Sequence, residues 1–400
     1  MRILIAEKFE QSGIDGLRRL GCDVAVNADV TTEALPALVK SEDPDILVVR
    51  GKKVPEPVFD AGGKLSLVIR AGAGYDTIDV AGASARGIIV ANCPGKNSIA
   101  VAELAWALIL ACDRRVPDQV ADLRQRKWNK KEYSKAAGLF GRTLGIVGFG
   151  QIGREVMKRG KAFGMNVVAW SRSLTPEQTE ELEIEYAATP VEIAQRSDVI
   201  SIHVAATGDT RHLVNRAFCE ALRPSAIVIN TSRGSVVDEE ALAAAVRTKG
   251  VRAGLDVFAN EPAGPNGEFN DGIVREPGVY GTHHIGASTD QAQQAIAEET
   301  VRIVQHLLRT GQVLNAVNVA RSTPATNVLT VRMLNRPGVL AHVFYILGQA
   351  GINVEEMENV IYEGAMAASA HIQLDDAPNA ELLTAIRANP SVISASVSRL

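Results

Sequence analysis

The sequence has little cysteine, few aromatic residues and no large excess of charge of one sign. Its four cysteines are scattered, without a CxxC pair or a histidine cluster at metal-ligand spacing; they are Cys22, Cys93, Cys112 and Cys219. We therefore expect reduced thiols and no metal site, as in a cytosolic protein. The net charge of −4 argues against nucleic-acid and membrane-surface partners, because neither a basic patch nor a block of like charge is present.

Long hydrophobic runs are also missing. The longest, from Ile99 to Cys112, is interrupted by Glu103 and is too short to cross a bilayer, so it predicts a buried helix. Residues 2–6 form an apolar strand pattern without the basic flank and cleavage site of a signal peptide, and we expect a cytoplasmic protein. A chain of 400 residues exceeds what one hydrophobic core usually serves, which predicts two or three domains.

Short apolar strands alternate with helical stretches from the N-terminus onward. The first series has expected strands at residues 2–6, 45–49, 65–69 and 88–91, with helices between them. Such continuous apolar strands predict a parallel sheet covered on both faces. A second series begins at Thr143 and has the rhythm of a doubly wound dinucleotide-binding domain; its strands are expected at 144–147, 166–170, 199–203, 226–230 and 254–257.

Residues 327–400 have a different order of elements, strand–helix–strand–strand–helix–strand, which predicts a ferredoxin-like module with an antiparallel sheet. The segment before it is rich in Gly, Ser, Thr and Asn and predicts a linker. The fold class is therefore α/β, with two doubly wound parallel-sheet domains, one flavodoxin-like and one Rossmann-like, and this third module. The expected bounds are 1–96 with 284–312, 97–283, a linker at 313–326, and 327–400.

A glycine-rich motif follows the first strand of the second series. The apolar residues from Leu144 run into GxGxxG and then into a helix, and the motif glycines are Gly148, Gly150 and Gly153. The first allows a tight turn, the second a close approach of the backbone to a pyrophosphate, and the third close helix–strand packing. The phosphates would lie at the start of the helix, at Gln151 and Ile152.

The next strand ends without the acidic residue that usually takes the ribose hydroxyls of NAD. Ser171 and Arg172 stand there instead. Neutral Ser171 does not repel a 2′-phosphate, and Arg172 can pair with one; alternatively, Arg172 stacks on the adenine or points into solvent. We expect NAD as cofactor and hypothesise that NADP is accepted.

Three segments of the second half place reactive groups at the ends of predicted strands: 229–234, 255–262 and 282–289. Oxidising a secondary alcohol by hydride transfer needs a base for the hydroxyl proton and a cation for the substrate carboxylate. An acid that holds the base in one tautomer helps further. His284, Arg233 and Glu261 have the side chains suited to these three tasks.

Residues 1–315 resemble the D-isomer-specific 2-hydroxyacid dehydrogenases. The family's NTSRG arginine falls on Arg233, its LDVFxxEP glutamate on Glu261 and its HIGxST histidine on His284. The resemblance implies that His284 is the acid–base catalyst, that Glu261 orients it, and that Arg233 binds the substrate carboxylate. It implies cofactor contacts at His203, Thr231, Ser232 and, for the nicotinamide carboxamide, Asp256. His283 departs from the family's usual proline, Ala205 from another proline, and Thr77 from asparagine.

The substrate side carries two arginines at predicted strand ends. Arg50 and Arg70 end neighbouring strands, at the edge where open α/β sheets bind ligands. Two cations there suit a substrate with a phosphate as well as a carboxylate, whereas Lys52 and Lys53 beside them also fit solvated loop charges. The Gly-rich turn with Ala73 and Gly74 can offer backbone amides to the carboxylate, and Asn97 belongs to the same family motif set.

Residues 327–400 resemble an ACT domain. A catalytic unit with this tail resembles the branch of the family that oxidises 3-phosphoglycerate to 3-phosphohydroxypyruvate in serine synthesis. The resemblance implies a homodimer or homotetramer and an amino-acid effector site at Asn335 and Asn353. Met333 stands where serine-inhibited forms often have histidine, so we expect serine to inhibit weakly or not at all.

Three other interpretations stay open. A hydroxypyruvate or glyoxylate reductase is favoured by Ser171 and Arg172 and disfavoured by the tail. A nucleotide-sensing corepressor of the same fold is disfavoured because the chain has no basic or disordered appendage. The tail could also be an amino-acid sensor in its own right.

Overall fold

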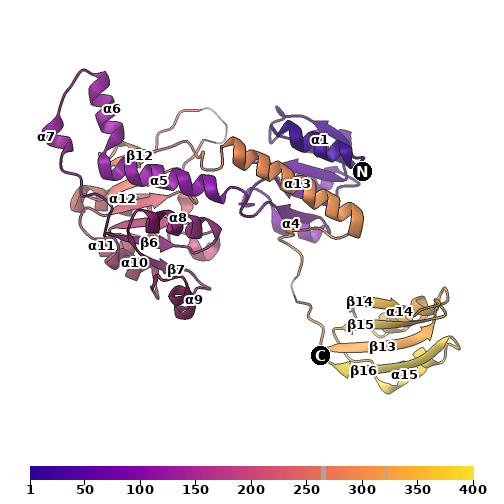
Figure 1. Ribbon diagram of the computed structural model, residues 1–400. Helices are drawn as coiled ribbons and strands as arrows, with labels where there is room; N and C mark the ends of the chain where they lie inside the picture. The colour runs from indigo at the N-terminus through magenta and orange to yellow at the C-terminus, as the bar shows by residue number, and fades with distance from the viewer. Residues whose placement is uncertain (263–266, 321) are drawn as a thin grey trace. The chain divides into compact units, whose positions relative to one another are not determined.

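The computed structural model describes residues 1–262, 267–320 and 322–400 (Figure 1). These residues divide into two compact units, Met1–Asn318 and Val319–Leu400. The first unit contains two parallel sheets and the second one antiparallel sheet. The predicted α/β class with a separate antiparallel module is therefore confirmed.

The first sheet has the strand order β2-β1-β3-β4-β5, which is the flavodoxin-like order. Its strands are β1 (Arg2–Ile5), β2 (Asp23–Val26), β3 (Ile46–Val49), β4 (Leu67–Arg70) and β5 (Ile89–Asn92). One face is covered by α1 (Gln11–Arg19) and α13 (Asp290–Thr310), and the other by α2 (Leu35–Glu42), α3 (Glu56–Ala61) and α4 (Val80–Ala85). The central strand β3 is buried along its whole length because both faces are covered, which explains its uninterrupted apolar sequence.

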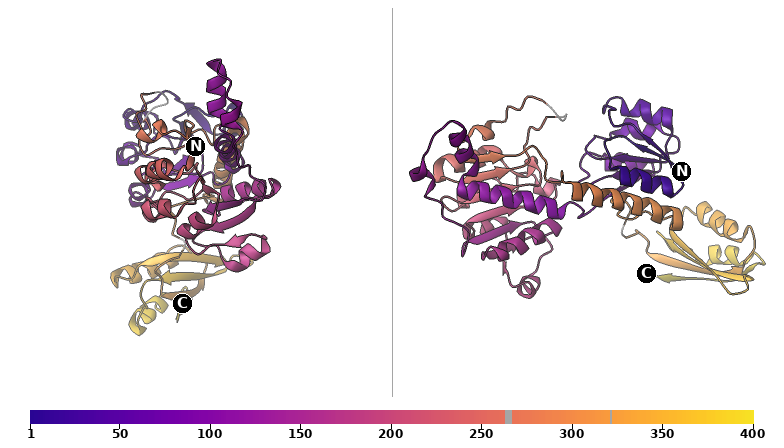
Figure 2. Two further views of the ribbon diagram at one scale, coloured as in Figure 1. Left: turned by 90° about the vertical axis from the view of Figure 1, so that its left-hand side faces the viewer. Right: turned by 45° about the horizontal axis from the view of Figure 1, so that its top comes forward.

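The return of α13 to the first sheet joins two distant parts of the chain. Figure 2 shows this long helix, in orange, beside the indigo strands of the sheet. Ile296, Ile303 and Val304 of α13 share a core with Ile14 and Leu17 of α1. This packing supports the discontinuous domain that we propose from the sequence for residues 1–96 and 284–312.

The second sheet has the order β12-β11-β10-β9-β6-β7-β8, and all its pairs are parallel. Counted from β6, this is the doubly wound 3-2-1-4-5-6 order with one added strand, and the order reverses between β6 and β9. The strands are β6 (Thr143–Val147), β7 (Asn166–Trp170), β8 (Glu185–Tyr186), β9 (Val199–Ile202), β10 (Ile227–Asn230), β11 (Arg252–Leu255) and β12 (Val279–Gly281).

Helices cover both faces of this second sheet. One face packs on α5 (Ser98–Arg114) and α8 (Gln151–Ala162), and the other on α10 (Pro190–Arg196), α11 (Arg216–Ala221) and α12 (Glu239–Lys249). The predicted buried helix at Ile99–Cys112 is α5. The short α9 (Pro176–Glu181) precedes β8, and α6 (Val116–Arg124) and α7 (Lys130–Tyr133) form an excursion after α5 (Figure 1).

The expected linker is shorter than the sequence indicates. Residues 313–318, which we expected in the linker, pack on the first sheet. Ala316 bridges Ala91, and the Val317 amide donates to the Val90 carbonyl at 2.8 Å. Val313 and Val317 pack against the cores on the two faces of the first sheet. In the sequence they stand among polar residues, so the segment shows no clear apolar pattern. The second unit begins at Val319.

The second unit has the predicted order of elements. Its strands β13 (Asn327–Leu334), β14 (Val354–Ile361), β15 (Ala367–Leu374) and β16 (Val392–Arg399) lie in the order β14-β15-β13-β16. The helices α14 (Val339–Gln349) and α15 (Ala380–Arg387) share one core with the sheet. On strand β14, Met357, Val360 and Ile361 are exposed at the sheet edge.

The described residues contain no helix that is long and apolar enough to cross a membrane. Within the same residues, no group of three or more His, Cys, Asp or Glu side chains could hold a metal ion. All four cysteines are buried free thiols.

Candidate active site

A cavity of about 620 Å³ lies at the carboxyl ends of the strands of both parallel sheets. Its walls come from the segments after β3 and β4 on one side and after β9, β10 and β11 on the other. Twelve of the predicted site residues line it: Arg50, Arg70, Ala73, Gly74, Asn97, Ile152, His203, Thr231, Ser232, Arg233, Asp256 and His284. The structure thus brings together residues that lie far apart in the sequence, from Arg50 to His284.

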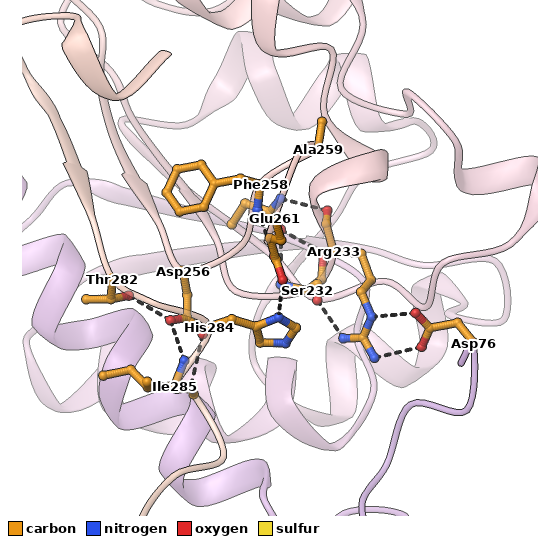
Figure 3. A network of polar contacts seen from close by, with 12 residues as sticks. Asp76, Ser232, Arg233, Asp256, Phe258, Ala259, Glu261, Thr282, His284 and Ile285 are labelled. Carbon is orange, nitrogen blue, oxygen red and sulfur yellow. Dashed lines mark hydrogen bonds and ion pairs between the residues drawn. The ribbon is translucent and has the colours of Figure 1, made fainter. Parts of the chain in front are cut away.

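His284 and Glu261 form a hydrogen-bonded pair beside this cavity. His284 Nδ1 lies 2.7 Å from Glu261 Oε2 (Figure 3). The second carboxylate oxygen of Glu261 accepts from the Phe258 amide at 2.9 Å. Burial opposes ionisation of Glu261, but the bonds to His284 and Phe258 outweigh it and hold the pKa of this carboxyl below its usual value. A carboxylate on Nδ1 places the lone pair of a neutral imidazole on Nε2, the nitrogen left to accept a proton.

The backbone of His284 is held in an unusual conformation. Its φ is +53°, in the left-handed region that costs a non-glycine residue free energy. Asp256 holds this segment: its side chain accepts from Thr282 Oγ1 at 2.7 Å, the Ile285 amide at 2.8 Å and the Gly286 amide at 2.9 Å. Asp256 is only 1% exposed, and both of its carboxylate oxygens serve this loop. The predicted contact of Asp256 with the nicotinamide carboxamide stays a prediction.

Arg233 is bound by a residue that the sequence did not single out. Its Nε and Nη2 donate to the two carboxylate oxygens of Asp76 at 3.0 and 2.8 Å (Figure 3). Burial opposes ionisation of Asp76, but Arg233 holds its pKa below the usual value. A Cβ at Gly74 would lie 1.9 Å from Arg233 Nη2, so only glycine lets the guanidinium take this place. Asp76 lies within the Gly-rich substrate motif, and that position is the sequence signal from which its place in the site could have been predicted.

Arg70 and Arg50 differ in how they are engaged. Arg70 Nε is buried without a hydrogen-bond partner among the described residues, and the guanidinium rests on Gly72, where a Cβ would lie 1.5 Å from Nη1. Burial and the neighbouring Arg233 lower the pKa of Arg70 to about 10, so it stays charged at neutral pH. Arg50 Nη2 lies 3.5 Å from Ser288 Oγ. The Lys52 ammonium instead donates to the Val30 carbonyl at 2.5 Å and does not line the cavity.

The turn after β6 fits a dinucleotide. Gly148 has a φ of +99°, and a Cβ there would lie 2.6 Å from the His203 backbone. A Cβ at Gly153 would lie 2.4 Å from the Gly148 carbonyl, whereas nothing lies within 4 Å of such an atom at Gly150. The second glycine therefore faces open space at the start of α8, where Gln151 is the first helical residue.

Two buried polar atoms point to a further ligand contact near this turn. His203 Nδ1 and Thr231 Oγ1 have no hydrogen-bond partner in the part of the chain that the structure describes. His203 Nε2 bonds to Ser201 Oγ at 2.7 Å, and burial lowers the pKa of His203 to about 3, so the ring is neutral. Donors and acceptors of this kind suit a bound dinucleotide.

Arg172, at the end of β7, faces solvent. Its side chain is 68% exposed, and Nη1 lies 3.7 Å from Asp209 Oδ2. Asp209 was not expected, and its carboxylate competes with a 2′-phosphate for the arginine. Acceptance of NADP through Ser171 and Arg172 stays a prediction.

The two predicted effector residues lie in the second unit. Asn335 Nδ2 donates to the Ala365 carbonyl at 3.0 Å, and Asn353 Nδ2 to Glu355 Oε1 at 2.7 Å. Met333 is buried in the core of this unit, at 3% exposed.

Comparisons with known proteins agree with this geometry. Residues 106–286 match the NAD-binding domain of the D-isomer specific 2-hydroxyacid dehydrogenases, which confirms the predicted type of cofactor. The chain is 38% identical over 321 residues to D-3-phosphoglycerate dehydrogenase of Methanocaldococcus jannaschii, covering 80% of this chain and 60% of that one. It is 43% identical over 259 residues to hydroxypyruvate reductase of Thermotoga maritima, covering 64% of this chain and 82% of the relative.

Solved structures show the same likeness. The NADPH-dependent glyoxylate/hydroxypyruvate reductase of Sinorhizobium meliloti, in complex with NADP and malonate, superimposes with a TM-score of 0.68 at 31% identity; the match covers 79% of this chain and 96% of that one. The chain spans about 60% of the length of the curated phosphoglycerate dehydrogenases that it matches. The match to most of the length of the Thermotoga reductase, together with the matching NAD-binding domain, establishes that the chain belongs to the D-isomer-specific 2-hydroxyacid dehydrogenase family.

Proposed function

We propose that the protein is an NAD(P)-dependent dehydrogenase that oxidises 3-phosphoglycerate to 3-phosphohydroxypyruvate, the first step of L-serine biosynthesis. One observation carries this proposal: Arg50 and Arg70 line the same cavity as Arg233 and His284. Three guanidinium groups in one cavity suit a substrate that has both a carboxylate and a phosphate.

Each proposed catalytic residue has one task. His284 Nε2 takes the proton of the substrate's 2-hydroxyl group, and Glu261 stabilises the imidazolium that forms, at 2.7 Å from Nδ1. Arg233 binds the carboxylate through the donors that Asp76 and the Ser232 carbonyl leave free. The nicotinamide ring, when bound, supplies the acceptor for the hydride from the second carbon of the substrate.

The phosphate is assigned to Arg70 and Arg50. Arg70 Nε lacks a partner among the described residues, so an anionic ligand would satisfy a buried donor there. Asn97 Oδ1 is also buried and without a partner in the same residues, so a hydrogen-bond donor of a bound ligand would satisfy it. D-3-phosphoglycerate dehydrogenases of several organisms share 33–38% identity with the chain over about four fifths of its length.

A hydroxypyruvate or glyoxylate reductase is the second candidate. The Thermotoga hydroxypyruvate reductase and the Thermococcus litoralis glyoxylate reductase are matched over 82% and 75% of their own lengths, more than the phosphoglycerate dehydrogenases are. The exposed Arg172 at the ribose end also favours an NADPH-linked reductase.

Initial rates of cofactor oxidation separate the two candidates. The assay uses 3-phosphohydroxypyruvate, hydroxypyruvate and glyoxylate, each with NADH and with NADPH. We expect a large kcat/KM preference for the phosphorylated ketoacid. Equal or better turnover of the unphosphorylated acids, above all with NADPH, would replace the first function by the second.

For the second unit we propose an ACT domain that joins copies of the chain into a homodimer or homotetramer. Met357, Val360 and Ile361 are exposed on β14, which is an edge strand of its sheet. An edge strand with apolar side chains is a pairing surface for a second copy. Replacing Val360 by lysine in the full chain should weaken this pairing and lower the mass measured by light scattering. For the effector site, we expect serine to inhibit the wild-type enzyme weakly or not at all.

A further inference from the structure

Glu7 binds three successive backbone amides of the loop that carries Arg50. It follows β1, which lies next to β3 in the first sheet, and the loop of residues 50–53 follows β3. Glu7 Oε2 accepts from the amide of Arg50, from that of Gly51 at 2.8 Å and from that of Lys52 at 3.0 Å. Consecutive amides that turn toward one point form a concave anion site, and here a side chain of the protein fills it.

The ends of this loop are held by backbone bonds, and its middle is held by Glu7. At one end Val49 belongs to β3, and at the other the Val54 amide donates to the Thr77 carbonyl at 2.9 Å. Between these ends, the amides of residues 50–52 go to the Glu7 carboxylate. Without that acceptor the three amides would turn to water, and the loop would be free to change its shape.

The guanidinium of Arg50 depends on this loop for its position. It lines the cavity together with Arg70, and its Nη2 lies 3.5 Å from Ser288 Oγ, which is too long for a strong hydrogen bond. Arg70, by contrast, is wedged against Gly72, where a Cβ would lie 1.5 Å from Nη1. A loop that moves should therefore displace Arg50 and leave Arg70 in place.

Glu7 also brings a negative charge to the edge of the sheet where the two arginines lie. Its charge raises the pKa of Arg70 and so offsets part of the effect of burial and of Arg233, which lower it to about 10. The neighbouring strands β1, β3 and β4 thus end in one acid and two arginines. The arginines line the cavity, whereas Glu7 does not.

We propose that Glu7 is a positioning residue for phosphate recognition: its carboxylate fixes the loop after β3 and thereby holds the Arg50 guanidinium in the cavity beside Arg70. This inference rests on the proposed function, because it concerns the phosphate of the proposed substrate. Glu7 acts through Arg50 and touches neither substrate nor cofactor. Its removal should therefore weaken the binding of a phosphorylated substrate and leave the rate of hydride transfer unchanged.

The kinetic test compares 3-phosphohydroxypyruvate with hydroxypyruvate, each with NADH, in wild type, Glu7→Ala, Glu7→Gln and the control Glu10→Ala. Glu10 is exposed, and its side chain makes no capping hydrogen bond at the start of α1. In Glu7→Ala, the KM for the phosphorylated ketoacid should rise about tenfold, with little change in kcat or in the KM for hydroxypyruvate. Glu7→Gln keeps an oxygen acceptor for the amides and should restore most of the loss, and Glu10→Ala should match the wild type.

A double-mutant cycle with Arg50 separates this positioning from a general support of the fold. If Glu7 acts through Arg50, adding Glu7→Ala to Arg50→Ala should not raise the KM for 3-phosphohydroxypyruvate any further. A residue that only supports the fold would cause the same loss in both backgrounds. Additive losses overturn the inference, and so does an equal rise of KM for both ketoacids in Glu7→Ala.

Hydrogen–deuterium exchange gives a readout that is independent of activity. The amides of residues 50–52 should exchange faster in Glu7→Ala than in wild type, and Glu10→Ala should exchange as the wild type does. If the wild type does not prefer the phosphorylated ketoacid, the proposed function fails, and the exchange rates decide separately whether Glu7 holds the loop. Unchanged exchange at residues 50–52 in Glu7→Ala overturns the inference.

Discussion

The polar groups proposed for the chemistry and those proposed to bind the ligands are held differently in this cavity. On the side that follows β10 and β11, Glu261 binds His284, and Asp256 uses both carboxylate oxygens on the next loop. Other polar atoms are buried without partners in the described part of the chain: Arg70 Nε after β4, Asn97 Oδ1 before α5, and His203 Nδ1 and Thr231 Oγ1 after β9 and β10. A buried polar atom without a partner costs about 1–3 kcal/mol, so such atoms indicate groups that a ligand completes.

This difference indicates that the two sets of groups have different tasks. The groups proposed for the chemistry are oriented before any ligand arrives, which reduces reorganisation during the reaction. The groups proposed for substrate recognition keep hydrogen-bonding atoms that a ligand can bind. Asp76 connects the two sides because it lies on the substrate side and binds Arg233 on the catalytic side.

Replacing His284 by glutamine should give the largest loss. As the proposed base it contributes about a thousandfold to the rate, a typical value for a positioned acid–base group. We expect kcat to fall by about that factor with KM nearly unchanged, measured in both directions of the reaction. His283→Gln is the matched control and should retain most of the activity. Loss of activity in both variants alike would contradict the assignment of the base.

Replacing Asp256 by alanine should remove the support of the catalytic side. The carboxylate makes three hydrogen bonds and keeps His284 at a φ of +53°. We expect kcat to fall about a hundredfold, because misplaced catalytic groups are costly, and the free energy of unfolding to drop by about 2–4 kcal/mol. Chemical denaturation and steady-state rates measure the two effects. A variant with normal kcat would show that the loop holds its shape without this residue.

Replacing Arg70 by alanine should affect recognition more than chemistry. We expect KM for 3-phosphohydroxypyruvate to rise about tenfold to a hundredfold, with a much smaller change for hydroxypyruvate, because only the first carries a phosphate. Lys53→Ala, at an exposed lysine three residues after Arg50, is the control and should change neither value. An equal loss for both ketoacids would assign Arg70 to the carboxylate or to structure instead.

The Asp76–Arg233 pair should give the smallest effect, visible as a pH dependence of stability. Arg233 lowers the pKa of Asp76 in the folded state, so the pair stabilises the fold above the unfolded value of about 4 and loses this contribution as pH falls through the folded value. The melting temperature of wild type should exceed that of Asp76→Asn at neutral pH, and the difference should vanish in acid. A difference that persists unchanged in acid would exclude this ion pair as its cause.

Much of the site was predictable from the residues. The strands of both parallel sheets are apolar runs bounded by turns, and their carboxyl ends meet at one edge, so Arg233, Asp256 and His284 were expected near one another. The glycines at 148, 150 and 153 were predicted from a short segment of sequence: Gly148 is required by its φ and a close approach and Gly153 by a close approach, whereas Gly150 faces open space.

Other features were not predictable. Asp76 binds a residue 157 positions away, and Asp209 approaches Arg172 from a separate loop. Lys52 stands beside Arg50 in the sequence, yet its ammonium turns to the Val30 carbonyl. The strands β2, β8 and β12 were not predicted, because β8 and β12 have only two and three residues and β2 buries only Val24. Residues 313–318 have too little apolar pattern to distinguish packing from a linker.

The sequence alone determined the α/β class, the dinucleotide turn and the residue types available for acid–base chemistry, because hydrophobic periodicity and glycine geometry act over a few neighbouring residues. The tertiary structure decided which of those side chains are already engaged. It bound Asp256 to the His284 loop, Arg233 to Asp76 and Glu7 to the loop after β3, and it left Arg70 Nε without a partner among the described residues. Hydrogen-bond partners come from segments far apart in the chain, so only the packed fold assigns them.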